Sequence, residues 1–489
     1  MHRLPSFVLF TCAVLAGCEK PPLIQYPGDP PAAPSTQQNA APVVDAGPDL
    51  TIDWPDARTQ LAATATDDGL PSRSLQFSWR ADSSEVEFND AALLTPTVTF
   101  AMPGTYTLTF TATDGALQAS DQVRVRVKST VYPAPDLSDA DPDRGWMRIA
   151  PGEVGMRPEG LVDAQAYALR AGGAGLISRH GYVVHSWGNI DERFDVKSTT
   201  KSIGSIALGI FMDENRLRID DRAVTHLPTF GTPPAWNDPT HLQAITLLQL
   251  ATHTAGFEKT GGYGVLLAAP GTQWHYSDGG LNWLADTLTT LYADDLQNLF
   301  VSRVWPVLGI NERDDIQWRR STSGLRRDPR PNGIEHREFA AGMVANVNTL
   351  ARVGLLFLRY GEWANAQRVV SPSFVELVRT PRPEAATAAL AEPTEFPDAQ
   401  HRYGVLWWTN ATGALPNVPR DAFWAWGLGD SLIVVIPSLD LVIARAGPQQ
   451  PATSRERTFG EADWNADYAV LAPFLDPIVQ SIAPRGGPT

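Results

Sequence analysis

Two short stretches of the chain alternate between apolar and polar side chains. Residues 105–110 place an aromatic or leucine side chain at every second position, and residues 123–128 alternate valine with a basic residue. A period of two is typical of half-buried β-strands. The turn-forming pairs Pro103-Gly104 and Asp114-Gly115 stand beside these runs. The pattern predicts a small all-β unit, which we place at residues 42–129.

A different pattern begins near residue 145 and continues to residue 484. Residues 176–184 predict two consecutive strands, residues 203–211 form an apolar stretch compatible with a helix, and residues 433–436 predict a late buried strand. This mixture predicts one large α/β domain over residues 145–484. A linker rich in Pro and Asp, residues 130–144, joins it to the β unit.

Composition excludes several classes of protein. The 489 residues carry a formal net charge of -15, with 39 Lys and Arg against 54 Asp and Glu. This balance argues against a nucleic-acid-binding function, which needs a basic face. The cysteines are Cys12 and Cys18, so the globular part has no disulfide, thiol nucleophile or cysteine-ligated metal. No apolar run reaches the roughly 18 residues needed to cross a bilayer.

The first residues resemble a secretory signal followed by a lipid-attachment site. Residues 1–17 have a weakly basic start, a short apolar stretch and small residues before Cys18. Leu15-Ala16-Gly17-Cys18 resembles the lipobox of bacterial lipoproteins; the alternative is an ordinary signal peptide with a chance cysteine. Residues 18–41 predict an extended Pro-rich tether. The resemblance implies a lipid-anchored protein of the bacterial cell envelope, at the periplasmic or surface face of an outer membrane, since Glu19 follows Cys18.

Ser198 and Lys201 stand three residues apart at the start of the helical stretch, and residues at this spacing share one face of a helix. A serine hydroxyl needs a neighbouring base to act as a nucleophile, and a buried lysine can lose its proton and serve as that base. Free N–H groups at a helix N-terminus also favour the oxyanion of acyl transfer. A capping serine beside a solvated lysine is the alternative. Among the five lysines, however, only Lys201 follows a serine at this spacing.

Further sequence blocks follow this pair in a fixed order. They are residues 247–257, His275-Tyr276-Ser277-Asp278, residues 339–342, residues 350–354 and residues 433–437. With Ser198-Thr199-Thr200-Lys201, they resemble the serine β-lactamase and penicillin-binding-protein fold, specifically the class C β-lactamase-related hydrolases, over about residues 155–447. The resemblance implies an antiparallel sheet flanked by helices, with a helical subdomain.

The resemblance also implies roles for individual residues. Ser198 corresponds to the acylated nucleophile, Lys201 to its base or proton relay, and Tyr276 to a second proton-transfer group. Asp278 stands where the family usually has Asn. Because an ionised Asp accepts but does not donate hydrogen bonds, we expect its contact with Lys201 to be ionic.

The family's third motif, Lys-Thr-Gly or His-x-Gly on a late strand, has no exact counterpart. Its place is assigned to Leu428-Gly429-Asp430, where leucine replaces the cation. The N–H of Ser431 is expected to complete the oxyanion hole. A leucine at this place favours uncharged esters or amides, because the family cation helps to hold a substrate carboxylate; Arg445 is the alternative source of positive charge.

Two motifs are set aside. Lys259-Thr260-Gly261 spells the third motif but precedes Tyr276, out of the family's order. Gly429-Asp430-Ser431-Leu432 spells the nucleophile motif of GDSL esterases, but no histidine follows His401 to serve as its base. The nine histidines lack metal-ligand spacing, so neither a metal nor a cofactor is expected.

The β unit resembles a PKD domain, an immunoglobulin-like sandwich. The resemblance rests on residues 45–49, Pro103-Gly104-Thr105-Tyr106 and Thr113-Asp114-Gly115. A fold of this kind does not define a function. We interpret the unit as a spacer, with binding of an envelope partner as the alternative.

The expected function is that of an exported, lipid-anchored serine hydrolase that acts through an acyl-enzyme, with esterase-like activity as the first choice. A β-lactamase or D-Ala-D-Ala carboxypeptidase acting on peptidoglycan-type substrates is the alternative within this class. A catalytically silent binding lipoprotein of the cell envelope is the alternative outside it. The expected partners are a small ester, amide or peptidoglycan-like substrate and, through lipid on Cys18, a membrane.

Overall fold

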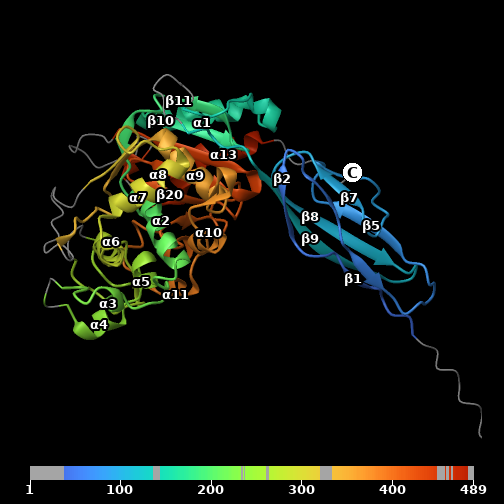
Figure 1. The fold of residues 1–489 in the computed structure, drawn as a ribbon, viewed down its shortest axis with the longest axis horizontal. Coiled ribbons are helices and arrows are strands. Elements are labelled where there is room, and N and C mark those ends of the chain that lie inside the picture. Colours follow the sequence, from blue (N-terminus) through green and yellow to red (C-terminus); the bar gives the residue numbers. More distant parts are fainter. Residues whose placement is uncertain are drawn as a thin grey trace, which may run out of the picture.

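A computed structural model describes residues 38–135, 144–232, 235, 237–259, 264–319, 333–448, 457–458, 462–463 and 466–482. An elongated all-β unit lies beside a larger unit of sheet and helices (Figure 1). Among these described residues, no helix is long and apolar enough to span a bilayer. Cys18 and the expected signal peptide lie outside the described residues, so lipid attachment stays a prediction.

The N-terminal unit is a β-sandwich, as the alternating pattern predicts. Its strands are β1 (Val43–Asp45), β2 (Leu50–Trp54), β3 (Arg58–Gln60), β4 (Thr64–Thr66), β5 (Gln76–Ala81), β6 (Val86–Phe88), β7 (Thr97–Phe100), β8 (Gly104–Thr113) and β9 (Gln118–Ser129). One sheet has the order β2-β9-β8-β5, another has the order β3-β7-β6, and β1 pairs with β4. Tyr106, Leu108 and Phe110 of β8 are fully buried between the sheets, which confirms the predicted period of two.

The larger unit is built on a six-stranded antiparallel sheet. In spatial order its strands are β11 (Tyr182–Trp187), β10 (Ala174–Arg179), β22 (Leu441–Ala446), β21 (Ser431–Ile436), β20 (Phe423–Gly427) and β19 (Trp408–Thr409). β10 and β11 form the predicted pair of strands, and positive φ angles at His180 (57°) and Gly181 (87°) reverse the chain between them. Every residue of β20, β21 and β22 is buried.

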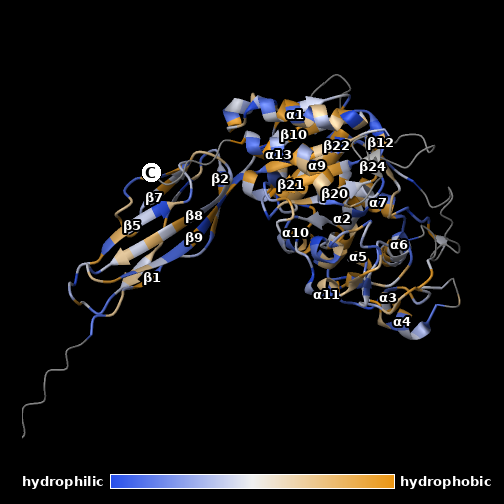
Figure 2. Ribbon diagram, turned by 180° about the vertical axis from the view of Figure 1, so that it is seen from behind, coloured by the Kyte–Doolittle hydropathy of each residue, from blue (hydrophilic) through white to orange (hydrophobic). Residues whose placement is uncertain are grey.

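The strands are buried because helices cover both faces of the sheet. α2 (Thr199–Asp213) and α9 (Val347–Leu358) contribute to the core on one face. α1 (Pro158–Ala168) and α13 (Ala472–Ser481) contribute to the core on the other. Figure 2 shows the hydrophobic colours concentrated in these central strands and in α9. α9 lies close to the sheet because Gly354 has no side chain; a Cβ there would lie 2.6 Å from the Val442 side chain.

A helical subdomain and several short elements complete the large unit (Figure 1). The helices of this subdomain are α3 (Ala223–His226), α4 (Pro239–Ala244), α5 (Leu247–Ala251), α6 (Asp278–Tyr292), α7 (Leu296–Arg303) and α8 (Trp305–Leu308). A small sheet has the order β12 (Arg193–Asp195), β15 (Met343–Asn346) and β14 (Ile316–Trp318). The other described strands and α-helices are β13 (Gln273–Trp274), β16 (Glu362–Trp363), β17 (Gln367–Arg368), β18 (Ala389–Leu390), β23 (Arg457–Thr458), β24 (Ala462–Asp463), α10 (Pro372–Arg379), α11 (Pro383–Ala386) and α12 (Ala399–Arg402). The architecture is the one that the sequence resemblance implies.

The end of β9 docks the sandwich onto the large unit. Lys128 Nζ pairs with Glu362 Oε1 at 2.6 Å. The Arg126 guanidinium lies 3.6 Å from the centre of the Tyr360 ring, and the Ser129 hydroxyl donates to a main-chain carbonyl in the β10–β11 turn at 2.8 Å. The two units are therefore joined by direct contacts as well as by the linker.

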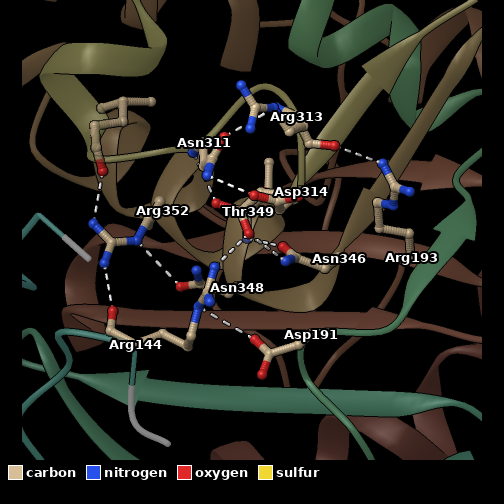
Figure 3. A network of polar contacts seen from close by, with 12 residues as sticks. Arg144, Asp191, Arg193, Asn311, Arg313, Asp314, Asn346, Asn348, Thr349 and Arg352 are labelled. Carbon is tan, nitrogen blue, oxygen red and sulfur yellow. Dashed lines mark hydrogen bonds and ion pairs between the residues drawn. The ribbon is translucent and has the colours of Figure 1, made fainter. Parts of the chain in front are cut away.

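The buried side chain of Arg352 binds the main chain of the linker (Figure 3). The Arg352 side chain, which is fully enclosed, donates to the carbonyls of Ala134 (2.9 Å), Arg144 (2.5 Å) and Leu308 (2.7 Å) and to the Asn348 side chain (3.1 Å). One guanidinium thus binds main-chain carbonyls on both sides of linker residues 136–143.

We expect Arg352→Met to lower the free energy of unfolding by about 3 kcal/mol or more, because it leaves buried carbonyls without donors. Arg193→Met is the matched control, since Arg193 reaches the Arg313 carbonyl from an exposed position. The control should change stability by less than about 1 kcal/mol. Denaturant unfolding of both variants measures the difference, and equal losses would contradict this role of Arg352.

Candidate active site

Ser198 lies at the N-terminal end of α2, after a tight turn. Lys197 has a positive φ of 47°, and the N–H of Thr199 donates to the Val196 carbonyl at 3.1 Å. Ser198 is partly exposed, whereas Thr199 and the two residues after it are buried. The N–H groups of Thr200 and Lys201 are also bonded within this turn, to the carbonyls of Lys197 and Ser198. The turn therefore presents the Ser198 hydroxyl at an accessible position.

Lys201 lies one helical turn further on and is only 1% exposed. Its Nζ donates to Ser198 Oγ at 2.8 Å and to the Ala340 carbonyl at 2.6 Å. It also forms an ion pair with Asp278 Oδ1 at 2.7 Å. All three oxygens therefore lie within 2.8 Å of the lysine nitrogen. The geometry places a charged lysine against the Ser198 hydroxyl.

Burial and charge act on the pKa of Lys201 in opposite directions. Burial lowers this pKa because the charged form is desolvated. The Asp278 carboxylate, joined by Tyr276, raises it by more, so the pKa of Lys201 lies above its ordinary value. The ammonium form therefore predominates at neutral pH. Direct proton abstraction by a neutral Lys201, one of the roles that the resemblance implies, is disfavoured in this arrangement.

Tyr276 covers another side of Lys201. The lysine Nζ lies 4.7 Å from the centre of the phenol ring. This ring is buried and packs between Phe396, at 4.8 Å and 15° between planes, and His253, at 4.4 Å. Tyr276 immediately precedes Ser277, which caps α6. The start of α6 therefore fixes the phenol and, two residues later, the carboxylate that pairs with Lys201.

The structure thus gathers Ser198, Lys201, Tyr276 and Asp278 into one cluster from separate segments. Two contributors escaped the residue-based analysis: the Ala340 carbonyl, which binds Lys201, and His253, which packs on Tyr276. Both lie in sequence blocks on which the resemblance rests, residues 247–257 and 339–342. A main-chain acceptor carries no residue-type signal, so Ala340 could not have been found from its identity.

The third motif differs from expectation. Leu428, Gly429 and Asp430 form the turn between β20 and β21 and do not lie on a strand, so the predicted strand position is wrong. The physical reason is the positive φ at Gly429 (75°) and Asp430 (57°), which reverses the chain. Gly427 is the strand residue that meets the nucleophile turn. A Cβ on Gly427 would lie 2.1 Å from the Val196 carbonyl oxygen.

Ser431 begins β21 and lies against the first turn of α2. Its carbonyl accepts a hydrogen bond from the Thr199 hydroxyl at 2.7 Å, and it is the cross-strand partner of Gly427. The main chain at Ser431 is therefore close to the nucleophile turn. The oxyanion-binding role of the Ser431 N–H stays a prediction.

Arg445 does not replace the missing cation. Its fully buried side chain donates to the carbonyls of Gly429, Asp430 (3.0 Å) and Gly172 (2.8 Å). Burial lowers the pKa of Arg445 to about 10, although Asp430 partly opposes this effect. The guanidinium supports the turn after β20 from within the core.

Lys259, from the motif that was set aside, lies beside the site. Its carbonyl accepts from the Asp278 N–H at 3.3 Å. Its ammonium pairs with Glu395 at 2.7 Å and lies 5.4 Å from the centre of the Phe396 ring. Lys259 is not on a strand, and the next two residues of the motif lie outside the described residues.

Four tryptophans that precede the third motif in the sequence belong to the buried core: Trp407, Trp408, Trp424 and Trp426. Across the part of the chain that the structure describes, no group of three His, Cys, Asp or Glu side chains is placed to hold a metal.

Comparisons with family models match the two units of the fold separately. The Beta-lactamase family model matches residues 161–460, and a family model of a PKD domain matches residues 46–127. The comparison with curated proteins gives no match.

Solved structures match about two thirds of the chain at low sequence identity. A Bacteroides dorei protein, provisionally assigned as a beta-lactamase, is 16% identical and covers 66% of this chain and 99% of its own, with a TM-score of 0.51. A family VIII carboxylesterase is 14% identical and covers 66% and 97%, with a TM-score of 0.48. A penicillin-binding protein homologue from Caulobacter crescentus is 15% identical and covers 67% and 99%, with a TM-score of 0.48.

The family match covers more than half of the chain and includes every element that builds the candidate site. The sandwich before it has its own family match. The chain belongs to the beta-lactamase family, and a PKD-like β-sandwich precedes its beta-lactamase domain.

Proposed function

We propose that the protein is a serine hydrolase in which Ser198 forms an acyl-enzyme with ester or amide substrates. The observation that carries this proposal is the enclosed Lys201 ammonium, held 2.8 Å from the partly exposed Ser198 hydroxyl. A capping serine with a solvated lysine would leave that ammonium in water. Membership of the beta-lactamase family, whose members are serine hydrolases, supports the same class of reaction.

Tyr276 is the proposed base. As Ser198 Oγ bonds to the substrate carbonyl carbon, its proton passes to the Tyr276 oxygen. This step requires an unprotonated Tyr276 oxygen, and the Lys201 ammonium, whose nitrogen lies 4.7 Å from the centre of the phenol ring, is the positive charge beside it. Tyr276 then gives the proton to the leaving oxygen or nitrogen as the bond between carbonyl carbon and leaving group breaks. Water then attacks the carbonyl carbon of the acyl-enzyme and gives its proton to Tyr276. Tyr276 returns this proton to Ser198 Oγ as the acyl bond breaks, which releases the acid and restores Ser198.

Main-chain N–H groups are the proposed oxyanion donors. The N–H of Ser198 lies at the start of α2, where the helix dipole also favours negative charge. The N–H of Ser431 is the proposed second donor, supported by the contact between its carbonyl and the Thr199 hydroxyl. Neither donor depends on a particular side chain, which fits the loss of the family's third-motif cation.

Uncharged acyl donors are the proposed substrates. Leu428 stands beside the strand end that meets the nucleophile turn, and Arg445 is occupied by main-chain carbonyls. A substrate carboxylate would therefore lack the charge-assisted partner that holds it in relatives with a third-motif cation. We further propose that lipid on Cys18 anchors the protein to the bacterial cell envelope, with the PKD-like domain as spacer.

Labelling with a fluorophosphonate probe, a panel of p-nitrophenyl esters and a fluorescent penicillin tests this function. We expect the probe to modify Ser198 and the esters to be hydrolysed, while Ser198→Ala reduces ester turnover by at least about 10³-fold. Ser205→Ala is the matched control, because Ser205 lies on the same helix with its hydroxyl bonded to the Ser202 carbonyl. Covalent labelling by penicillin would favour a β-lactamase or D-Ala-D-Ala carboxypeptidase. No labelling by any reagent would favour a silent binding protein.

The Asp278–Lys201 pair predicts a pH dependence. Since Asp278 raises the pKa of Lys201, Asp278→Asn should lower it. The ammonium would then be lost at lower pH, and the alkaline limb of kcat/KM should move to lower pH by about one to three units. Glu395→Gln, which removes a carboxylate bonded to Lys259 and not to Lys201, is the control. An unshifted alkaline limb in Asp278→Asn would contradict the proposed ammonium role.

A further inference from the structure

His253 makes three contacts with the segment that carries Tyr276. Its imidazole ring centre lies 4.4 Å from that of the phenol. Its carbonyl accepts from the His275 N–H at 2.9 Å, and its Nδ1 accepts from the Ser277 N–H at 3.1 Å. The residues directly before and after Tyr276 are therefore both hydrogen-bonded to His253. The left-handed conformation of His253, with φ 61°, permits its main chain and side chain to reach the same segment.

These contacts define the chemical state of the imidazole. A ring nitrogen that accepts an N–H bond carries no proton, so the proton of neutral His253 lies on Nε2. Burial, reinforced by the Lys201 ammonium and by His275, holds the pKa of His253 well below its ordinary value. The ring is thus neutral and is fixed in one tautomer by its acceptor role.

The other ring nitrogen shows what the imidazole contributes. Within the described part of the chain, the buried Nε2 of His253 has no hydrogen-bond partner. Burying an unpaired N–H costs about 1–3 kcal/mol, a cost that a phenylalanine ring of similar shape would avoid. The contribution specific to histidine is therefore the Nδ1 acceptor, which holds the main chain at Ser277.

We propose that His253 is a positioning residue that aims the Tyr276 phenol at Lys201 and Ser198. The inference rests on the proposed proton-transfer role of Tyr276. His253 is too enclosed to touch substrate, so its effect passes through Tyr276. A displacement of about 1 Å in a reacting group can cost 10²-fold in rate. Without the hydrogen bond from the Ser277 N–H to His253 Nδ1, the main chain directly after Tyr276 is no longer held, although the ring contact with residue 253 remains.

A double-mutant cycle isolates this effect. His253→Phe keeps an aromatic ring but removes the acceptor. His253→Asn keeps an acceptor at the δ position and tolerates the left-handed backbone. The second-order rate of Ser198 labelling by a fluorophosphonate probe is measured for both variants, for Tyr276→Phe and for the Tyr276→Phe/His253→Phe double variant. Circular dichroism and thermal unfolding confirm that each variant is folded.

We expect His253→Phe to slow labelling roughly 10²-fold and His253→Asn to remain within about 10-fold of the unmodified protein. In the Tyr276→Phe background, His253→Phe should change the rate by less than about twofold, because residues that act as one unit are not additive. Ring ¹⁵N shifts of histidine-labelled protein should show one signal of an Nε2-protonated tautomer that disappears in His253→Asn.

Additive losses in the double variant, or His253→Asn as slow as His253→Phe, would show that His253 supports only the fold and would overturn the proposal. Failure of the proposed function is visible separately. In that case Tyr276→Phe reacts at the unmodified rate or Ser198→Ala is still labelled, and the positioning role falls with it.

Discussion

A positive charge enclosed in the large domain is the constraint on which the site depends. An unpaired ammonium in the interior would carry a penalty of several kcal/mol. Lys201 avoids it because its ammonium pairs with Asp278 and donates to the Ala340 carbonyl and to Ser198 Oγ. These oxygens come from α6, from the loop before β15 and from the start of α2. Folding the domain and assembling the site therefore satisfy the same electrostatic requirement.

Close contacts between main-chain segments hold the groups around Lys201 in position. Gly427 brings β20 against the nucleophile turn, and Gly204 of α2 lies against the Phe339 ring, where a Cβ would be 2.7 Å away. Phe339 immediately precedes Ala340, so the packing of α2 also positions the carbonyl that binds Lys201. A side chain at Gly204 would push α2 away from Phe339, and one at Gly427 would push β20 away from the nucleophile turn. The geometry of the polar cluster thus depends on the glycines at positions 204 and 427 as well as on its polar side chains.

These dependencies explain which features the sequence could predict. The sandwich strands, the β10–β11 pair and the α2 helix follow from local periodicity, and all are present. Asp278 could be expected to make an ionic contact because its chemistry differs from that of Asn. The position of Leu428-Gly429-Asp430 in a turn could not be predicted, because a turn defined by positive φ at Asp430 leaves no periodic signal in the sequence. The Lys201 charge state depends on distances between remote segments, which residue types alone do not encode.

The docking of the PKD-like domain has a consequence for access to the site. β9 contacts the turn between β10 and β11 and the segment after α9. The β10–β11 turn lies at the strand end where Arg179 pairs with Leu441, whereas Gly427 and Ser431, which lie beside the nucleophile turn, pair with each other at the opposite end of β20 and β21. The sandwich is therefore attached at the end of the strands away from Ser198. Docked in this way, the sandwich leaves the partly exposed Ser198 hydroxyl uncovered.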